Sequence, residues 1–138
     1  MGMFMDKLIV AIGSALSIGF GVWHFFVPGI WNWYSYIDPR ATELVLAVRA
    51  INFFFSLSLI LFGAMNLFLA FIPNASKGAT ILVLSATVVL WLSRVIMQVL
   101  YPQGSMQPLL RYGMLCIFVV ILCCYAIPLL RLAAIKDR

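Results

Sequence analysis

One stretch of this sequence places polar and aromatic groups inside a strongly apolar segment. At steps of four, three, four and three residues it carries Thr87, Trp91, Arg94, Gln98 and Tyr101. At that spacing the five side chains share one face of an α-helix. A guanidinium in the middle of a membrane helix costs roughly 3 kcal/mol unless it finds partners. We therefore expect Arg94 to face the protein or a hydrated pocket.

Other polar residues are expected at the same, outer end of the protein: His24, Arg49, Asn52 and Arg111. The acids expected there are only Asp38 and Glu43, so the site is left positive or binds an anion. Guanidinium groups suit carboxylate and phosphate, and tryptophan and tyrosine rings can stack on a planar ligand. These residues predict a basic, aromatic-lined pocket for an anionic lipid or a quinone-like amphiphile.

Each candidate also has a structural interpretation. Arg94 could pair with Glu43 or with helix-end carbonyls and hold two helices together, or it could extend to lipid phosphate. Arg49 lies nearer the interface and could be structural or lipid-facing. His24 could form only internal hydrogen bonds, or handle protons or a ligand. The sequence leaves these alternatives open.

The composition is that of a membrane protein. Of 138 residues, 65% are hydrophobic and 9% charged, whereas soluble domains are about half apolar and a quarter charged. The net charge of +5 is spread over loops and ends, which favours contact with a lipid bilayer over nucleic acid.

The apolar segments and the prolines between them predict the elements that position the candidates. We expect one all-α domain over 1–138, an antiparallel up-down bundle of four transmembrane helices at about 8–27, 39–72, 79–101 and 109–133. Asp38-Pro39 is typical of a helix start. The basic residues Lys7, Lys77, Arg131, Lys136 and Arg138 place both termini in the cytoplasm.

Four further features favour packing or anchoring. Gly13, Ser17 and Gly21 form a small-residue ridge on which another helix, or a protein partner, could dock. The aromatic residues Trp31, Trp33, Tyr34 and Tyr36 are typical of an interfacial belt. Asn66 is expected to bond between helices. Cys116, Cys123 and Cys124 have neither redox nor metal-site spacing, so we expect them to pack in the last helix.

No catalytic constellation is visible in the sequence. It has no Ser/His/Asp set, phosphate loop, close carboxylate pair or bis-histidine pattern for haem, and we predict neither a metal nor a cofactor other than a quinone. These observations favour a non-enzymatic binding or accessory subunit. The alternative is a structural or assembly subunit of a membrane complex.

Two short motifs resemble those of the DoxX-like membrane proteins. They are Val48-Arg49-Ala50 with Glu43 ahead of it, and Ser93-Arg94 before a loop containing Gly104. The resemblance implies a four-helix protein of the bacterial inner membrane, of undefined activity, in a group with members that serve quinone-linked redox complexes. Such proteins often carry an acid near the start of helix 4, where this chain has Arg111 and Tyr112.

Arg49-Ala50-x-Asn52 is also similar to a motif of the four-helix glutathione and eicosanoid enzymes of membranes, although its spacing is one residue short. That resemblance implies a glutathione-dependent enzyme as a third alternative.

Overall fold

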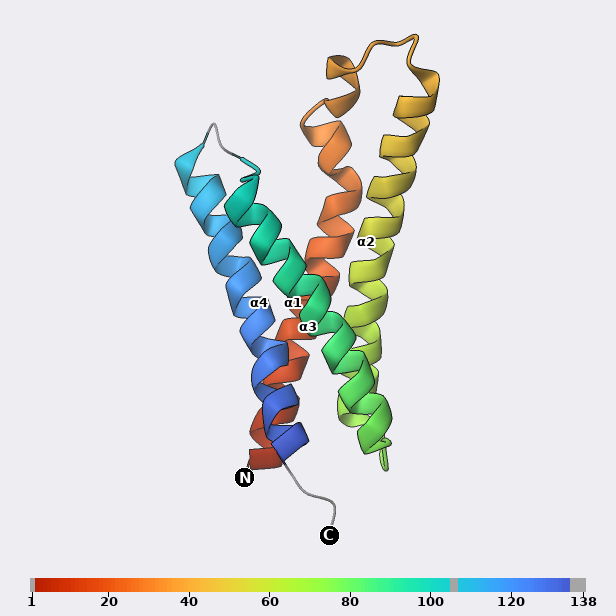
Figure 1. The fold of residues 1–138 in the computed structure, drawn as a ribbon. Helices are drawn as coiled ribbons and strands as arrows, with labels where there is room; N and C mark the ends of the chain where they lie inside the picture. Colours follow the sequence, from red (N-terminus) through yellow and green to blue (C-terminus); the bar gives the residue numbers. More distant parts are fainter. Residues whose placement is uncertain (1, 105–106, 135–138) are drawn as a thin grey trace.

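The computed structural model describes residues 2–104 and 107–134, which form four long helices and one short 3-10 helix (Figure 1). The elements are α1 (Gly2–Ile30), η1 (Trp33–Tyr36), α2 (Thr42–Phe71), α3 (Lys77–Leu100) and α4 (Pro108–Ala134). Each of the four α-helices is long and apolar enough to cross a membrane. The all-helical class is confirmed, and the helices indicate a multi-pass membrane protein. Lys136 and Arg138, used above to predict orientation, lie outside the described residues.

The bounds of two predicted helices need correction. The first helix extends beyond 8–27 at both ends, and Pro28 lies inside its last turn. The second begins at Thr42 instead of residue 39, because Asp38 does not cap it. The Asp38 carboxylate instead accepts the Arg40 backbone N–H, at 2.9 Å, in a turn that precedes the helix.

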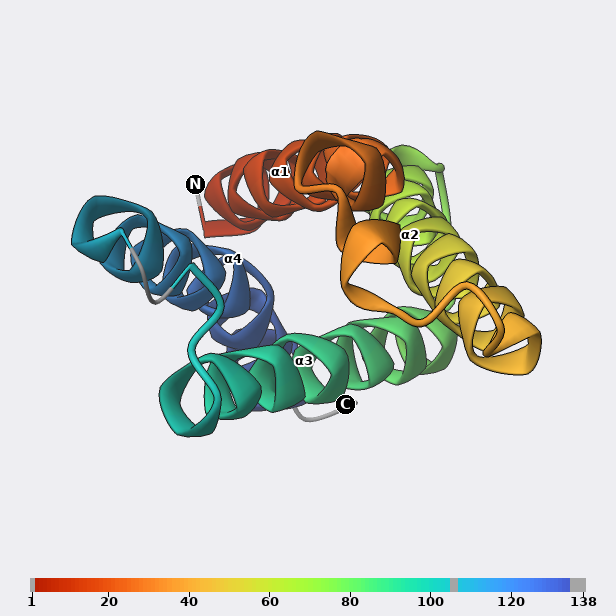
Figure 2. The ribbon, with the colours of Figure 1, turned by 90° about the horizontal axis from the view of Figure 1, so that it is seen from above.

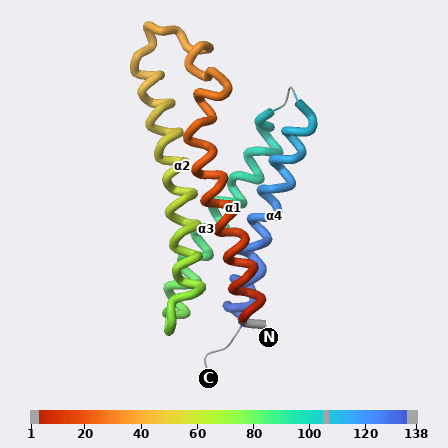
Figure 3. Tube along the Cα trace, turned by 180° about the vertical axis from the view of Figure 1, so that it is seen from behind, coloured from red at the N-terminus to blue at the C-terminus, as the bar shows by residue number. Residues whose placement is uncertain are grey.

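The helices form two pairs that diverge toward one end. Figures 1 and 3 show α1 with α2 and α3 with α4, and the view from above shows the four helices following one another around a ring (Figure 2). We call the diverging end, which carries the connections 31–41 and 101–107, the splayed end. At the other end an ion pair joins α1 to α4, with Arg131 Nη1 2.7 Å from Asp6 Oδ1.

Glycines allow α1 and α2 to pack closely. A Cβ added to Gly21 would lie 2.8 Å from the backbone oxygen of Ser56, and one added to Gly63 would lie 2.8 Å from Ile18. Small residues at such contacts let helix backbones approach. The contact fixes the pair that carries His24, Arg49 and Asn52 of the predicted site.

The small-residue ridge of α1 is filled by the chain's own helices. Gly13 lies against Cys124 and Tyr125 of α4, and Ser17 Oγ lies 3.0 Å from the Tyr125 hydroxyl. Gly21, at the far end of the ridge, is covered by α2. The ridge does accept neighbouring helices, but its residues are buried and do not offer a surface to a separate protein.

Polar side chains make up much of the buried faces, while many large apolar side chains are exposed. The buried residues of α2 are Asn52, Ser56, Leu59, Gly63 and Asn66. Lipid tails are as apolar as leucine, so hydrogen bonding and close packing hold such helices together. Asn66 Nδ2 donates to Thr87 Oγ1 of α3 at 2.6 Å, which confirms its predicted role between helices.

Three aromatic rings join α1, α3 and α4 where the two pairs cross. The Phe20 ring lies 6.0 Å from Trp91 and 5.1 Å from Phe118, and Trp91 lies 5.7 Å from Phe118. Trp91 and Phe118 are buried. This aromatic junction closes the bundle core, and the helices separate beyond it toward the splayed end.

Candidate functional site

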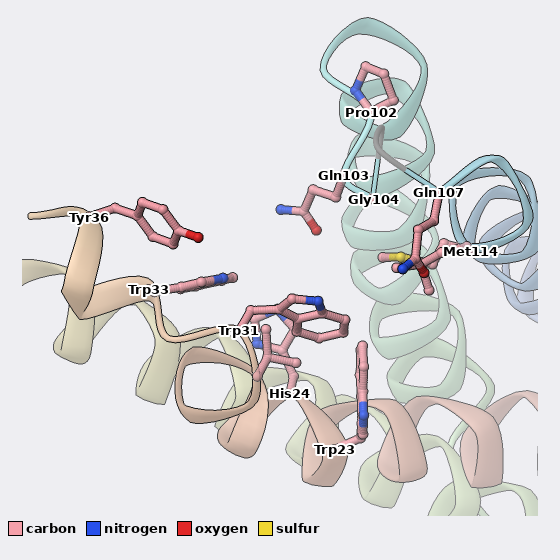
Figure 4. A pocket seen from close by; sticks show the side chains of 12 residues that line it. Trp23, His24, Trp31, Trp33, Tyr36, Pro102, Gln103, Gly104, Gln107 and Met114 are labelled. Carbon is pink, nitrogen blue, oxygen red and sulfur yellow. The ribbon is translucent and has the colours of Figure 1, made fainter.

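A cavity of about 700 Å³ lies between the two helix pairs at the splayed end. Figure 4 shows aromatic side chains from the first pair on one side and Gln103, Gln107 and Met114 from the second pair on the other. Its volume is in the range of small-molecule sites. The lining consists of Trp23, His24, Val27, Trp31, Trp33, Tyr36, Pro102, Gln103, Gly104, Gln107, Leu110 and Met114.

The aromatic wall forms because the chain turns sharply after α1. Asn32 adopts a left-handed conformation with φ 49°, which asparagine tolerates better than most residues. Trp31 continues the helical hydrogen bonding of α1 and lies 5.5 Å from Trp23, and the turn then brings Trp33 to 6.3 Å from His24, between ring centroids. Three residues of the predicted interfacial belt, Trp31, Trp33 and Tyr36, therefore line the cavity.

The opposite wall depends on the loop after α3, which Gln98 holds in place. Its amide nitrogen donates to the backbone oxygens of Gln103, at 3.1 Å, and Arg111, at 3.4 Å. Its amide oxygen accepts the Gln103 backbone N–H at 3.3 Å. Gln98 is 2% exposed and does not line the cavity. Gln98, one of the residues predicted to bind a ligand, thus holds in place the loop that lines the cavity.

Arg94 reaches the cavity only through another side chain. Its Nη2 donates to Gln103 Oε1 at 2.5 Å, and its guanidinium carbon lies 4.5 Å from the centre of the Phe118 ring. Gln103, and not Glu43, is therefore the partner that the structure gives Arg94. The Gln103 amide oxygen accepts from Arg94. The amide nitrogen is the group of this side chain that can donate to a ligand.

His24 is the one predicted site residue that lines the cavity directly. Its Nδ1 lies 3.3 Å from Ser56 Oγ, and that hydroxyl donates to the Asn52 backbone oxygen at 2.7 Å. The hydroxyl therefore accepts from His24, which puts the hydrogen of a neutral imidazole on Nδ1 and makes Nε2 an acceptor. Asn52 and Arg94 both lie within interaction range of the ring.

The other predicted residues do not converge on the cavity. Arg49 lies over the Tyr34 ring at 4.9 Å, and Arg111 lies 5.5 Å from the Tyr112 ring. Tyr101 is 70% exposed, because α3 ends before it and its backbone leaves the helical conformation. Arg49 is exposed while Asn52 is buried, so the pair that resembles the glutathione enzymes does not meet at one surface.

The lining is aromatic and amide-rich, with no arginine or lysine among its residues. The basic character predicted for the pocket therefore lies behind its wall, at Arg94. Buried polar atoms are also found behind the wall: Asn52 Oδ1, Trp91 Nε1 and Arg94 Nε have no hydrogen-bond partner among the described residues. Folded proteins leave few such atoms unpaired, so this region suits water or a polar ligand group.

Sequence reasoning missed Trp31, Trp33, Tyr36, Gln103 and Gln107 as members of one lining. The aromatic density of residues 31–36 was visible, but the turn at Asn32 that directs it inward was not. Within the described part of the chain, no group of three His, Cys, Asp or Glu residues lies together as metal ligands would. Comparison with protein-family models, curated proteins and solved structures finds no match.

Proposed function

We propose that this chain is a small membrane protein, DoxX-like in type, that binds a quinone-like amphiphile without catalysing a reaction on it. In this role it is a binding or accessory subunit. The observation that carries the proposal is the cavity of about 700 Å³ with tryptophans on one side and glutamine amides on the other.

The chemistry of the lining matches a planar ring with carbonyl or hydroxyl groups. Indole faces such as those of Trp31 and Trp33 stack on a flat conjugated ring. The amide of Gln103 can donate to a carbonyl oxygen, and Nε2 of His24 can accept from a hydroxyl of the reduced ring. A pocket with apolar walls and a few placed polar groups is the usual form of a small-molecule site.

An anionic lipid headgroup fits the same lining less well. A phosphate needs several donors or a positive charge close by, and Arg94 already donates to Gln103 from behind the wall. The described lining supplies two glutamine amides and one imidazole instead. We therefore propose that the polar head of the ligand is a neutral ring and not a phosphate.

The proposed setting is the bacterial inner membrane, with four antiparallel helices in up-down order. Lys7, Lys77 and Arg131 support it, because positive charge at helix ends favours the cytoplasmic side. The splayed end and its cavity then open toward the outer face. A ligand that lives in the bilayer could reach it without crossing the membrane.

Titration calorimetry in lipid nanodiscs with a decyl-substituted benzoquinone tests the proposal. We expect saturable binding to the wild type and about tenfold weaker binding to Trp33→Leu, which removes one wall of the cavity. Tyr101→Leu is the matched control, because Tyr101 is exposed and outside the lining. Binding that does not saturate, or equal binding to all three proteins, would contradict the proposal.

A further inference from the structure

A second hollow, an apolar groove of about 610 Å³, runs between α1 and α4. Gly19, Phe20 and Trp23 form its α1 side, and Leu110, Gly113 and Ile117 form most of its α4 side. Ile117 is 48% exposed and Leu16, at the edge, is 38% exposed, so the groove opens sideways. In a membrane this opening faces lipid.

The groove is continuous with the cavity. Trp23, Gln107, Leu110 and Met114 line both hollows. The two differ in character, because the cavity carries His24 and Gln103 while Gln107 is the one amide among the groove residues. The cavity, with its few polar groups, thus leads into an apolar groove that opens on the bilayer.

The groove exists because α1 and α4 touch only near the aromatic junction and below it. Gly13 and Ser17 pack on Cys124 and Tyr125, and beyond that contact the two helices diverge toward the splayed end (Figure 1). The resulting space lies beside the cavity.

Two glycines of the groove make no close contact with the described residues of other elements. A Cβ added to Gly19 or Gly113 would meet nothing within 4 Å, whereas one added to Gly13 would lie 2.7 Å from Cys124. Glycine is less favourable than alanine inside a helix, so these two positions are not explained by the fold itself. Their missing side chains deepen the groove from both walls.

We infer that the groove holds the apolar chain of the same amphiphile whose polar ring occupies the cavity, and that the ligand enters from the bilayer between α1 and α4. This inference rests on the proposed function. From Ala15 to Trp23 the α1 wall is about 12 Å long at 1.5 Å per residue. That is about the extended length of a decyl chain.

The test compares a decyl-substituted benzoquinone with the same benzoquinone lacking the chain, by calorimetry in nanodiscs. The proteins are the wild type, Gly19→Leu, Gly113→Leu and the control Gly29→Leu, since a Cβ at Gly29 also meets nothing and Gly29 is outside the groove. For each protein we take the ratio of the two affinities and compare the ratios. The partitioning of the chain into lipid contributes equally to every ratio and therefore cancels. A lysophospholipid is added as a competitor.

We expect both groove variants to lower the chain-dependent affinity ratio about tenfold, because leucine fills the space of the chain, and to leave binding of the chainless ring unchanged. Gly29→Leu keeps the wild-type ratio. Unchanged chainless binding also shows that the variants fold. If the lysophospholipid competes with the decyl-substituted benzoquinone in the wild type but not in Gly113→Leu, the result supports the groove as the binding site of the apolar chain.

A wild-type ratio retained by both groove variants would overturn the inference and leave the proposed function standing. If the wild type binds neither benzoquinone and the lysophospholipid also fails to bind, the proposed function falls with it. Binding of the lysophospholipid alone, still blocked by Gly113→Leu, would retain the groove and replace the ring by a lipid headgroup.

Discussion

Arg94 and Gln103 form a pair in which a half-buried charge of α3 is tied to the wall of the cavity. The guanidinium donates to the Gln103 amide oxygen at 2.5 Å, while its Nε is buried with no partner among the described residues. Hydrogen bonds that involve a charged group contribute about 1.5–3 kcal/mol, so the pair stabilises the Arg94 charge through one of its nitrogens and orients Gln103.

The pair predicts a non-additive pattern of stability. Gln103→Leu leaves the half-buried guanidinium without this partner and should lower the free energy of unfolding by about 1 kcal/mol. The double variant Arg94→Leu/Gln103→Leu removes the charge as well and should be more stable than Gln103→Leu. Unfolding by SDS in mixed micelles, followed by circular dichroism, measures this coupling. Additive losses would show that the pair does not stabilise the bundle.

Close packing of α1 on α2 predicts a strong effect of one methyl group. Gly21→Ala places a Cβ 2.8 Å from the Ser56 backbone oxygen, which cannot move freely, and should destabilise the protein by about 2 kcal/mol. Gly29→Ala is the control, because its Cβ meets nothing within 4 Å. Thermal unfolding in detergent compares the two. Equal melting temperatures would mean that the two helices are not held at this distance.

The Asn66–Thr87 hydrogen bond is expected to join α2 to α3. Thr87→Val keeps the shape of the side chain but removes the acceptor, so it should lower the free energy of unfolding by about 1 kcal/mol. Thr80→Val is the control, since the Thr80 hydroxyl bonds only to Ser76 at the start of its own helix. The measurement is again SDS unfolding, and a loss in the control as large as that in Thr87→Val would speak against the interhelical bond.

The proposed orientation predicts which loops an impermeant reagent can reach. In a protein with its three cysteines replaced, S35C in the connection after α1 should react with a membrane-impermeant maleimide in intact spheroplasts. G78C, near the turn between α2 and α3, should react only after permeabilisation. The reverse pattern would place the cavity on the cytoplasmic side.

The four helices could be predicted because apolar runs and the prolines that separate them are local signals. The polar stripes were equally readable, since Asn52, Ser56, Asn66 and Thr87 are all buried. The start of α2 was misplaced because Asp38 can cap a helix or close a turn, and sequence does not distinguish the two.

The site was harder to predict because its wall depends on backbone geometry. The left-handed Asn32 turns an expected membrane anchor into a cavity lining, and Gly104, with φ 73°, shapes the loop that carries Gln103. Arg94 was correctly singled out as a residue that needs a partner. Its partner, however, lies in a loop nine residues away and carries no charge, which charge pairing alone would not suggest.

The most direct test of the cavity is native mass spectrometry of the protein purified gently from its own membranes. The wild type is expected to retain one amphiphile with a quinone-like ring, identified by fragmentation, and Trp33→Leu of equal stability is expected to lose it. A wild type that carries no defined amphiphile, or a Trp33→Leu protein that carries the same one in equal amount, would contradict the account.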